Sequence, residues 1–291
     1  MSAFNSPTSW IVLSEIEQRI KDKIEAIGTP LKEWDISINY GIKTGYNEAF
    51  IIDNEKREEL IKQDPKSAEI IRPILRGRDI KKYSYEYNDL WIINTHNGIK
   101  DKGVSAIDID NYPAIKEHLN KYYAQLEKRT DKGISPFHLR NCAYMSDFFK
   151  HKLVYTEIMT DNPDEGYDFP CFSFDENSSI ALNTAYIMTG DLNELKYIMC
   201  LLNSKLGKQL VKFYVVQLQQ RQYRMLNQYV VDFPIPKLTL EDYMNFGNLA
   251  TKILENKKIN QDFKELEKTI KDKVYNIFNM SKEEIDFIEL Q

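Results

Sequence analysis

The sequence predicts an α+β fold in which an irregular, β-rich domain is supported by helices toward both ends. Residues 13–27 repeat apolar side chains every three or four positions, as an amphipathic helix does. The segments KLVYTEIM, FPCFSF and IALNTAYIM, within residues 135–185, have strand patterns separated by Asp, Asn, Gly and Pro clusters. Helical patterns return after residue 239. We therefore expect a helix and connector over residues 1–34, a β-rich domain over 35–238 and a helical support over 239–291.

Composition places the chain among ordinary globular proteins. It has 291 residues, of which 42% are hydrophobic and 29% charged. No apolar run approaches the ~20 residues that span a bilayer, and the first ten residues lack a signal-peptide pattern. We expect a cytoplasmic protein without a membrane partner. Cys142, Cys171 and Cys200 are widely spaced and odd in number, so we interpret them as reduced structural residues rather than metal ligands.

The first part of the chain alternates helix and strand signals. Gly28 and Pro30 end the first helix, and alternating isoleucines predict a strand over residues 36–42. A turn over residues 44–47 and an apolar strand over 49–52 follow, then a short helix over 54–63. Residues 83–94 resemble a hairpin with Asn88 and Asp89 at its turn. Pro113 opens another helix, which ends at Lys128 and Arg129, where positive charge is favourable.

A long helix is predicted from Asp191, which caps it, to Phe213. Lys205, Lys208 and Lys212 are spaced so that they share an outer flank, which could follow a phosphate backbone or be merely solvated. Further helices are expected over residues 240–256 and 259–278. Ser281 and Glu284 predict a capping box for the last one.

Positive charge gathers in two places although the net charge is −5. The stretch RPILRGRDIKKY, residues 72–83, places Arg76, Arg78, Lys81 and Lys82 around Gly77. A loop of this kind can offer its cations to phosphates or guanine edges. The alternative is a set of surface charges partnered by nearby acids, Asp79 and Glu86 among them.

The second basic region runs from residue 195 to 231, where six charged residues are positive and none is negative. Its end, QLQQRQYRMLNQY, is rich in amides and contains Gln220, Arg221 and Arg224. Amides and guanidinium groups read purine edges. The pattern leaves open whether this segment is a loop that contacts DNA or an extension of the helix packed inside the domain.

Several motifs in order carry a resemblance to a known family. GIKTGYNEAFII (residues 41–52) precedes the basic stretch, and LEKRTDKGISPFHLRNCAY (126–144), LLNSKLGKQLVKFY (201–214), FPIP (233–236) and VYNIFNMSKEEIDFIE (274–289) follow. This series resembles the TaqI-like C-terminal specificity domains, the DNA-reading half of many adenine-specific DNA methyltransferases and type IIG restriction-modification enzymes. The amide-rich segment departs from the family because it lacks the usual glycine.

The resemblance implies a target-recognition domain for double-stranded DNA, with a methyltransferase or restriction domain as partner in cis or trans. The chain lacks a glycine-rich S-adenosylmethionine loop and an Asn-Pro-Pro-Tyr motif; the nearest match, at Asp161, is interpreted as a turn. We therefore expect no catalytic residue, metal or cofactor in this chain, and S-adenosylmethionine only in the partner domain. The residues predicted to bind DNA are Thr44, Tyr46, Asn47, Arg76, Arg78, Lys81, Lys82, Arg140, Lys205, Lys208, Lys212, Gln220, Arg221 and Arg224.

Two other function classes are compatible with the sequence. One is a protein-interaction or assembly module of a restriction-modification complex, which the acidic C-terminal helices suit. The other is a metal-dependent nuclease in which Asp53, Glu55 and Lys56 converge.

Overall fold

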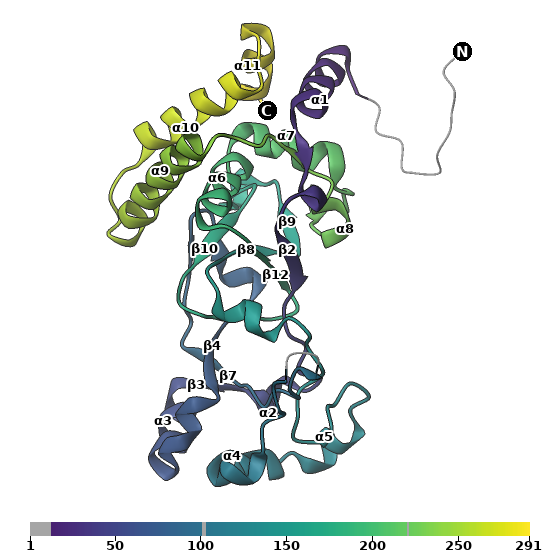
Figure 1. The fold of residues 1–291 in the computed structure, drawn as a ribbon, viewed down its shortest axis with the longest axis vertical. Helices are drawn as coiled ribbons and strands as arrows, with labels where there is room; N and C mark the ends of the chain where they lie inside the picture. Colours follow the sequence, from purple (N-terminus) through teal and green to yellow (C-terminus); the bar gives the residue numbers. More distant parts are fainter. Residues whose placement is uncertain (1–12, 101–102, 220) are drawn as a thin grey trace, which may run out of the picture. The chain divides into compact units, whose positions relative to one another are not determined.

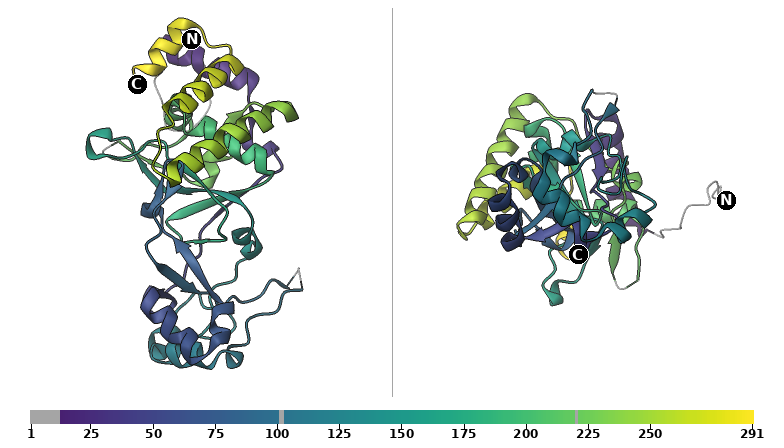
Figure 2. Two further views of the ribbon diagram at one scale, coloured as in Figure 1. Left: turned by 90° about the vertical axis from the view of Figure 1, so that its left-hand side faces the viewer. Right: turned by 90° about the horizontal axis from the view of Figure 1, so that it is seen from below.

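The computed structural model describes residues 13–100, 103–219 and 221–291. These form two compact units that are interleaved along the chain (Figures 1 and 2). Unit 1 contains the residues up to Ile36 together with Ile158–Cys171 and Lys196–Gln291, and unit 2 contains Ser37–Glu157 and Phe172–Leu195. The predicted boundaries 1–34, 35–238 and 239–291 follow the chain order, whereas each of these units collects separate segments.

Unit 1 begins with α1 (Glu15–Ile27), as the apolar periodicity predicted. Ser14 accepts a hydrogen bond from the Glu17 amide while the Glu17 carboxylate accepts one from Ser14, which forms a capping box. Ile20 and Ile24 are fully buried. After the helix, β1 (Thr29–Pro30) pairs antiparallel with β14 (Pro234–Ile235), so FPIP forms a sheet with a segment some two hundred residues earlier.

The predicted long helix is two helices. These are α6 (Leu192–Leu202) and α7 (Lys205–Tyr214). Ser204 lies in an extended conformation and its hydroxyl caps α7 by accepting from the Gly207 amide. A Cβ added at Gly207 would lie 2.2 Å from the Leu202 carbonyl oxygen, so the tight turn needs glycine. Asp191 caps α6 as predicted, through the amides of Asn193 and Glu194.

The amide-rich segment is neither a plain loop nor a continuation of α7. Its centre, β13 (Gln222–Arg224), pairs antiparallel with β9 (Ile158–Thr160) to form a two-stranded ribbon. The one-turn helix α8 (Asn227–Val230) follows. Hydrogen bonds to β9 therefore satisfy the backbone N–H and C=O groups of this segment, which a helix would have satisfied by hydrogen bonds within the segment.

The last helices of unit 1 agree with the prediction in number and order within the described residues. They are α9 (Leu240–Lys258), α10 (Lys264–Ile277) and α11 (Lys282–Glu289). Figure 1 shows α9 and α10 as an adjacent pair in yellow-green and yellow. The Ser281–Glu284 capping box is present, and Glu284 also accepts a hydrogen bond from Lys23 of α1 at 2.6 Å. Single 3-10 turns lie at η1 (Leu31–Glu33) and η7 (Pro163–Glu165).

Unit 2 is built on two four-stranded sheets. The first, antiparallel throughout, has the order β10 (Phe172–Asp175), β8 (Lys152–Thr156), β12 (Ala185–Thr189), β2 (Ser37–Tyr40). The second has the order β11 (Ile180–Ala181), β4 (Ile71–Leu75), β7 (Leu90–Ile93), β3 (Ile51–Asp53), with β11 parallel to β4. β5 (Ile80–Lys81) pairs with β6 (Ser84–Tyr85). β2 confirms the strand pattern at 36–42. The pattern at 152–159 forms β8 and part of β9, and the pattern at 169–174 contributes to β10. The pattern at 180–188 forms two strands, β11 and β12, in different sheets.

The predicted hairpin over residues 83–94 is wrong. β6 pairs with the preceding strand, β5, through a turn at Tyr83, whose φ is 61°. β7 does not pair with β6 but lies between β4 and β3 in the second sheet. Ile92 and Ile93 are fully buried, and the apolar run of β7 therefore suits a central strand better than the outer arm of a hairpin.

Helices of unit 2 flank these strands. α3 (Asn54–Gln63) has the predicted bounds, and α4 (Pro113–Asn120) begins with the predicted proline but is separated from α5 (Tyr123–Lys128). The strand predicted over 49–52 is a one-turn helix, α2 (Asn47–Phe50), followed by β3. The 3-10 turns are η2 (Pro65–Glu69), η3 (Gly77–Asp79), η5 (Ile109–Asn111) and η6 (Met145–Phe149). The α+β class is confirmed. Among the described helices, none is both long and apolar enough to cross a bilayer.

Candidate nucleic-acid interface

The basic loop, residues 76–82, follows β4 and is fixed to the rest of unit 2 at Gly77. The Gly77 amide donates to the Thr184 hydroxyl at 2.9 Å. A Cβ at this position would lie 2.3 Å from the Thr184 carbonyl oxygen and 2.6 Å from Thr156 Oγ1. Only glycine permits this approach, so the RGR pattern reflects a packing requirement as well as a charge pattern.

Arg76 closes the loop on itself. Its Nε and Nη2 donate to Asp79 Oδ2 and Oδ1 at 2.9 and 2.7 Å, and its backbone amide donates to Oδ2 at 2.8 Å. Asn88 donates to Oδ1 at 3.0 Å. The hydrogen bond that Arg76 donates to the Asp79 carboxylate raises the pKa of Arg76. The predicted alternative, in which acids partner these cations, therefore holds for Arg76, and its guanidinium is committed to a bidentate pair inside the protein.

The remaining cations of the loop differ from Arg76. Arg78 is exposed, and no ion pair or hydrogen bond to its side chain occurs in the described part of the chain. Lys81 is half-buried, and the Lys82 ammonium lies 5.3 Å from the centre of the Tyr83 ring. Arg78 is thus the member of the loop whose guanidinium is available to a ligand.

A buried charged pair holds the strand that follows the loop. Tyr85 of β6 donates to Asp175 at 3.0 Å, and Asp175 accepts from Lys152 at 2.6 Å. Both charged side chains are fully buried. Burial lowers the pKa of Lys152, and burial together with Asp175 raises that of the Tyr85 hydroxyl, which keeps it a donor. The network gives the basic loop a rigid base.

The GIKTGYNEAF segment forms a turn at the start of α2. Thr44 is 3% exposed and its hydroxyl donates to Asn47 Oδ1 at 2.6 Å, while Gly45 has φ of 71°. The Tyr46 ring is half-buried beside Tyr122, with centroids 6.0 Å apart. Asn47 is exposed. Of the three predicted contact residues in this turn, Asn47 is exposed to solvent. The hydroxyl of the buried Thr44 donates to Asn47 and so fixes the position of its side chain.

Arg129 organises this turn, a role that the sequence reasoning missed. It was interpreted as a favourable charge at a helix end, but it is 7% exposed and donates to the carbonyl groups of Thr44, Pro136 and His138. Its guanidinium lies 4.7 Å from the centre of the Phe50 ring. Burial lowers its pKa. The loop 136–140, which ends in the exposed Arg140, is therefore bonded to the Thr44 turn.

In unit 1 the predicted lysine flank of α7 divides. Lys205 is exposed and donates to the Glu289 carbonyl at 3.3 Å, whereas Lys208 is 8% exposed and donates to Asp161 at 2.8 Å. Lys212 is half-buried, and burial and Lys208 lower its pKa. The prediction that the three lysines share an outer flank is wrong for Lys208, because Asp161, which follows β9, covers this side chain.

The second pair of arginines flanks β13, with Arg221 just before the strand and Arg224 at its last position. Arg221 has φ of 62°, is exposed, and approaches Asp161 Oδ2 at 3.4 Å. Arg224 is exposed at the end of β13. Gln220 lies outside the described residues. The Phe169 ring stacks with the Tyr223 ring of β13, with centroids 5.1 Å apart, and the Lys208 ammonium lies 5.7 Å from the centre of the Phe169 ring.

Two of the three residues considered for a nuclease, Asp53 and Lys56, have structural roles. Asp53 caps α3 by accepting from the Lys56 amide at 2.8 Å, and Lys56 pairs with Glu59. No group of His, Cys, Asp and Glu suited to a metal is found among the described residues.

This fold occurs in solved restriction-modification enzymes. The type IIL restriction-modification enzyme MmeI in complex with DNA matches with a TM-score of 0.63 and 15% identity, over 89% of this chain and 35% of that one. The type IIG restriction endonuclease BpuSI matches with a TM-score of 0.52 and 12% identity, over 90% of this chain and 33% of that one. The chain thus spans about a third of the length of either.

The family is shown by sequence as well. The family model of the TaqI-like C-terminal specificity domain matches residues 72–235, which run from the basic stretch to FPIP. The chain belongs to the TaqI-like C-terminal specificity domain family, and the predicted resemblance is confirmed.

Proposed function

We propose that this chain is the double-stranded DNA recognition domain of an adenine-N6 methyltransferase or a type IIG restriction-modification enzyme, and that it has no catalytic centre of its own. Membership of the specificity-domain family over residues 72–235 carries this proposal. The likeness in fold to MmeI, whose structure was solved with DNA, supports it.

The arrangement of unit 2 suggests how contacts are divided. The Arg76–Asp79 pair, the Gly77 contact and the Arg129 hydrogen bonds fix the basic loop, the Thr44 turn and the loop 136–140. Arg78, Asn47 and Arg140 stay exposed on these segments. Exposed guanidinium and amide groups on rigid loops can bind phosphates, which positions the protein on the duplex, and can read base edges. Because the loops are already ordered, binding costs little conformational entropy. We assign base readout to Asn47 and Arg78, and phosphate contacts to Lys81, Lys82 and Arg140.

The exposed cations of unit 1 supply further phosphate contacts in this proposal. Lys205, Arg221 and Arg224 are exposed and Lys212 half-buried, whereas Lys208 is held by Asp161 and serves the fold. Methyl transfer belongs to a methyltransferase domain in cis or trans, which binds S-adenosylmethionine. In this proposal the complex acts in the cytoplasm.

Selection from a random duplex library tests the proposal. The purified chain is incubated with the library at low and moderate salt, and bound DNA is sequenced. Recovery of one short motif is expected, with affinity that falls steeply as salt rises because phosphate contacts release counterions. Arg78→Ala should relax the motif at one position, and Lys62→Ala, at an exposed site on α3, is the matched control. Absence of any enriched motif at either salt would overturn recognition by the isolated chain.

A second candidate is an assembly module that binds protein. Leu240 and Met244, one helical turn apart on α9, are 72% and 51% exposed. Apolar side chains on one helix face suit a protein partner. A chain that binds a methyltransferase partner but shows no duplex binding at low salt would support this candidate instead.

A further inference from the structure

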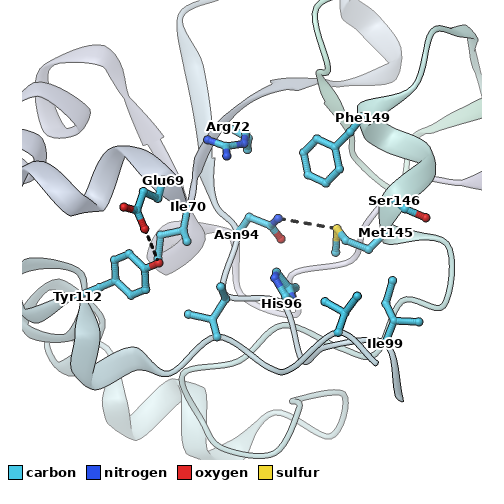
Figure 3. Close-up of a pocket in the computed structure, with 12 residues that line it drawn as sticks. Glu69, Ile70, Arg72, Asn94, His96, Ile99, Tyr112, Met145, Ser146 and Phe149 are labelled. Carbon is cyan, nitrogen blue, oxygen red and sulfur yellow. Dashed lines mark hydrogen bonds between the residues drawn. The ribbon is translucent and has the colours of Figure 1, made fainter. Parts of the chain in front are cut away.

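Unit 2 contains a pocket of about 380 Å³ that none of the predicted contact residues lines (Figure 3). Its walls come from the turn before β4, from the segment after β7 and from η6. Most of the lining is apolar, and a few polar groups converge on it: Arg72, Asn94, His96 and the Glu69–Tyr112 pair. A small apolar cavity with few polar groups is the usual composition of a ligand site, and its volume is at the lower end of the range of about 300–1,000 Å³.

Asn94 is the unusual member of this lining. It is 4% exposed, and its Oδ1 has no hydrogen-bond partner in the described part of the chain. Its Nδ2 faces the Met145 sulfur at 3.8 Å, which is a weak acceptor. A buried carbonyl oxygen without a donor is destabilising and is rare in native proteins. Figure 3 shows Asn94 among the lining residues, with His96 close by. A ligand N–H group in the pocket would satisfy this oxygen.

His96 offers the complementary group. Its Nδ1 accepts from the Gly98 amide at 3.1 Å, so in the neutral ring the proton is on Nε2. Burial and the neighbouring His138 lower the pKa of His96 and keep the ring neutral. Asn94 and His96 both line the pocket and therefore present one acceptor and one donor to it. The edge of a nucleobase carries an N–H donor beside an acceptor.

The aromatic and cationic groups fit the same ligand. Phe149 lines the pocket and is 43% exposed, as a ring at the pocket mouth would be. Aromatic rings bind bases by stacking. Arg72 keeps its Nη1 on the carbonyl groups of Ala68 and Ile71, both at 3.0 Å, which places a fixed positive charge beside the pocket where a phosphate could approach.

We propose that this pocket binds a single nucleobase, with its N–H donor on Asn94 Oδ1, its acceptor facing His96 Nε2 and its ring against Phe149. The base can come from a free nucleoside or from a nucleotide extruded from duplex DNA. The second source rests on the proposed function and the first does not.

Free nucleosides test the first source. Adenosine, cytidine, guanosine and thymidine are titrated up to millimolar concentration and followed by calorimetry and by NMR shifts. Purine riboside, which lacks the amino group of adenosine, and 3-methylthymidine, which lacks the N–H of thymidine, are matched probes. The analogue of the preferred base should bind about 10-fold more weakly, since a buried acceptor is left without a donor.

Two variants assign the binding to this pocket. Asn94→Leu keeps the side-chain volume and removes the unsatisfied oxygen, so we expect loss of binding with an unchanged or higher melting temperature. Phe149→Ala, at an exposed ring, should weaken binding about 10-fold without unfolding the chain. A merely structural Asn94 would instead lower the melting temperature on substitution and leave binding unchanged, which overturns the assignment.

Duplex DNA tests the second source. In the motif recovered by selection, 2-aminopurine is placed in turn next to each base, where its fluorescence rises when the neighbouring base leaves the stack. A rise at one position that is abolished by Asn94→Leu identifies an extruded base as the ligand. Duplex binding without any such rise, together with no nucleoside binding, overturns the pocket and leaves DNA recognition intact. Failure of all duplex binding overturns the proposed function, and the nucleoside titration still decides the pocket.

Discussion

Arg76 and Asp79 face each other across a single 3-10 turn, and the pair takes both carboxylate oxygens, with contacts of 2.9 Å from Nε and 2.7 Å from Nη2. The two arginines on either side of Gly77 therefore have different roles. Arg76 is occupied within the protein and Arg78, two positions on, is exposed.

Asp79→Asn should destabilise unit 2, whereas Arg78→Ala should not. Asp79 is 3% exposed, and its two carboxylate oxygens accept from Arg76 and Asn88. Asparagine has a single acceptor oxygen and no charge, so one or more of these donors would lose its acceptor. We expect a loss of about 1–3 kcal/mol in the free energy of unfolding, against less than about 0.5 kcal/mol for Arg78→Ala. Urea denaturation of both variants measures this. Equal stability of the two would contradict the division of roles.

Arg129→Met should loosen the Thr44 turn. The substitution keeps most of the side-chain volume but removes the donors to the carbonyl groups of Thr44, Pro136 and His138. We expect about 2–4 kcal/mol lower stability, since several buried acceptors lose their partner. Hydrogen exchange should accelerate at residues 43–47. Lys128→Met, at the exposed neighbouring position, is the control and should change neither quantity.

Lys208→Met and Lys205→Met should differ although both lysines lie on α7. Lys208 is buried against Asp161, and removal of its ammonium leaves a buried carboxylate, at a cost of about 3–5 kcal/mol. Lys205 is exposed, so its substitution should cost less than about 0.5 kcal/mol. Adding Asp161→Asn to Lys208→Met should restore part of the loss in chemical denaturation. No restoration would show that the two side chains act independently.

Glu284→Gln should make the stability of unit 1 less dependent on acidic pH. Burial alone would raise the pKa of Glu284, but hydrogen bonds from Lys23 and Ser281 outweigh it and lower the pKa below its ordinary 4.5. A depressed folded-state pKa adds stability above pH 4.5, and this is lost as the pH falls through the folded value. The variant should therefore be less stable than the parent at pH 7 and approach it below pH 4. Unfolding curves recorded from pH 3 to 7 measure the difference, and a constant gap would contradict it.

Local patterns were sufficient wherever an element is stabilised by its own residues. α1, α3 and α11 have caps and apolar spacing within one short stretch, and each was predicted within a few residues. The class of fold and the family motifs were also readable, because both are sums of such local signals.

Pairing between distant segments could not be read from the sequence in the same way. The run at Leu90–Ile93 is apolar whether it ends a hairpin or sits between β4 and β3, and only the partners decide. Lys208 has the spacing of an outer flank, and its burial depends on Asp161, forty-seven positions earlier. Arg129 looked like a helix-end charge because its three carbonyl partners carry no side-chain signature. The described positions of the predicted contact residues are consistent with DNA binding for some and with a structural role for others, and their contacts to DNA stay predictions.

The strand pair β1–β14 has a consequence for synthesis of the chain. Thr29 and Pro30 are synthesised about two hundred residues before their partners Ile235 and Pro234. Lys23 of α1 is separated from its partner Glu284 by 261 positions. During translation, the apolar stripe of α1 therefore stays exposed to solvent while the residues of unit 2 are synthesised. Unit 2 ends at Leu195 and can fold first, and unit 1 closes only after α11 has been made. A stall between these points would leave Ile20 and Ile24 accessible to a chaperone.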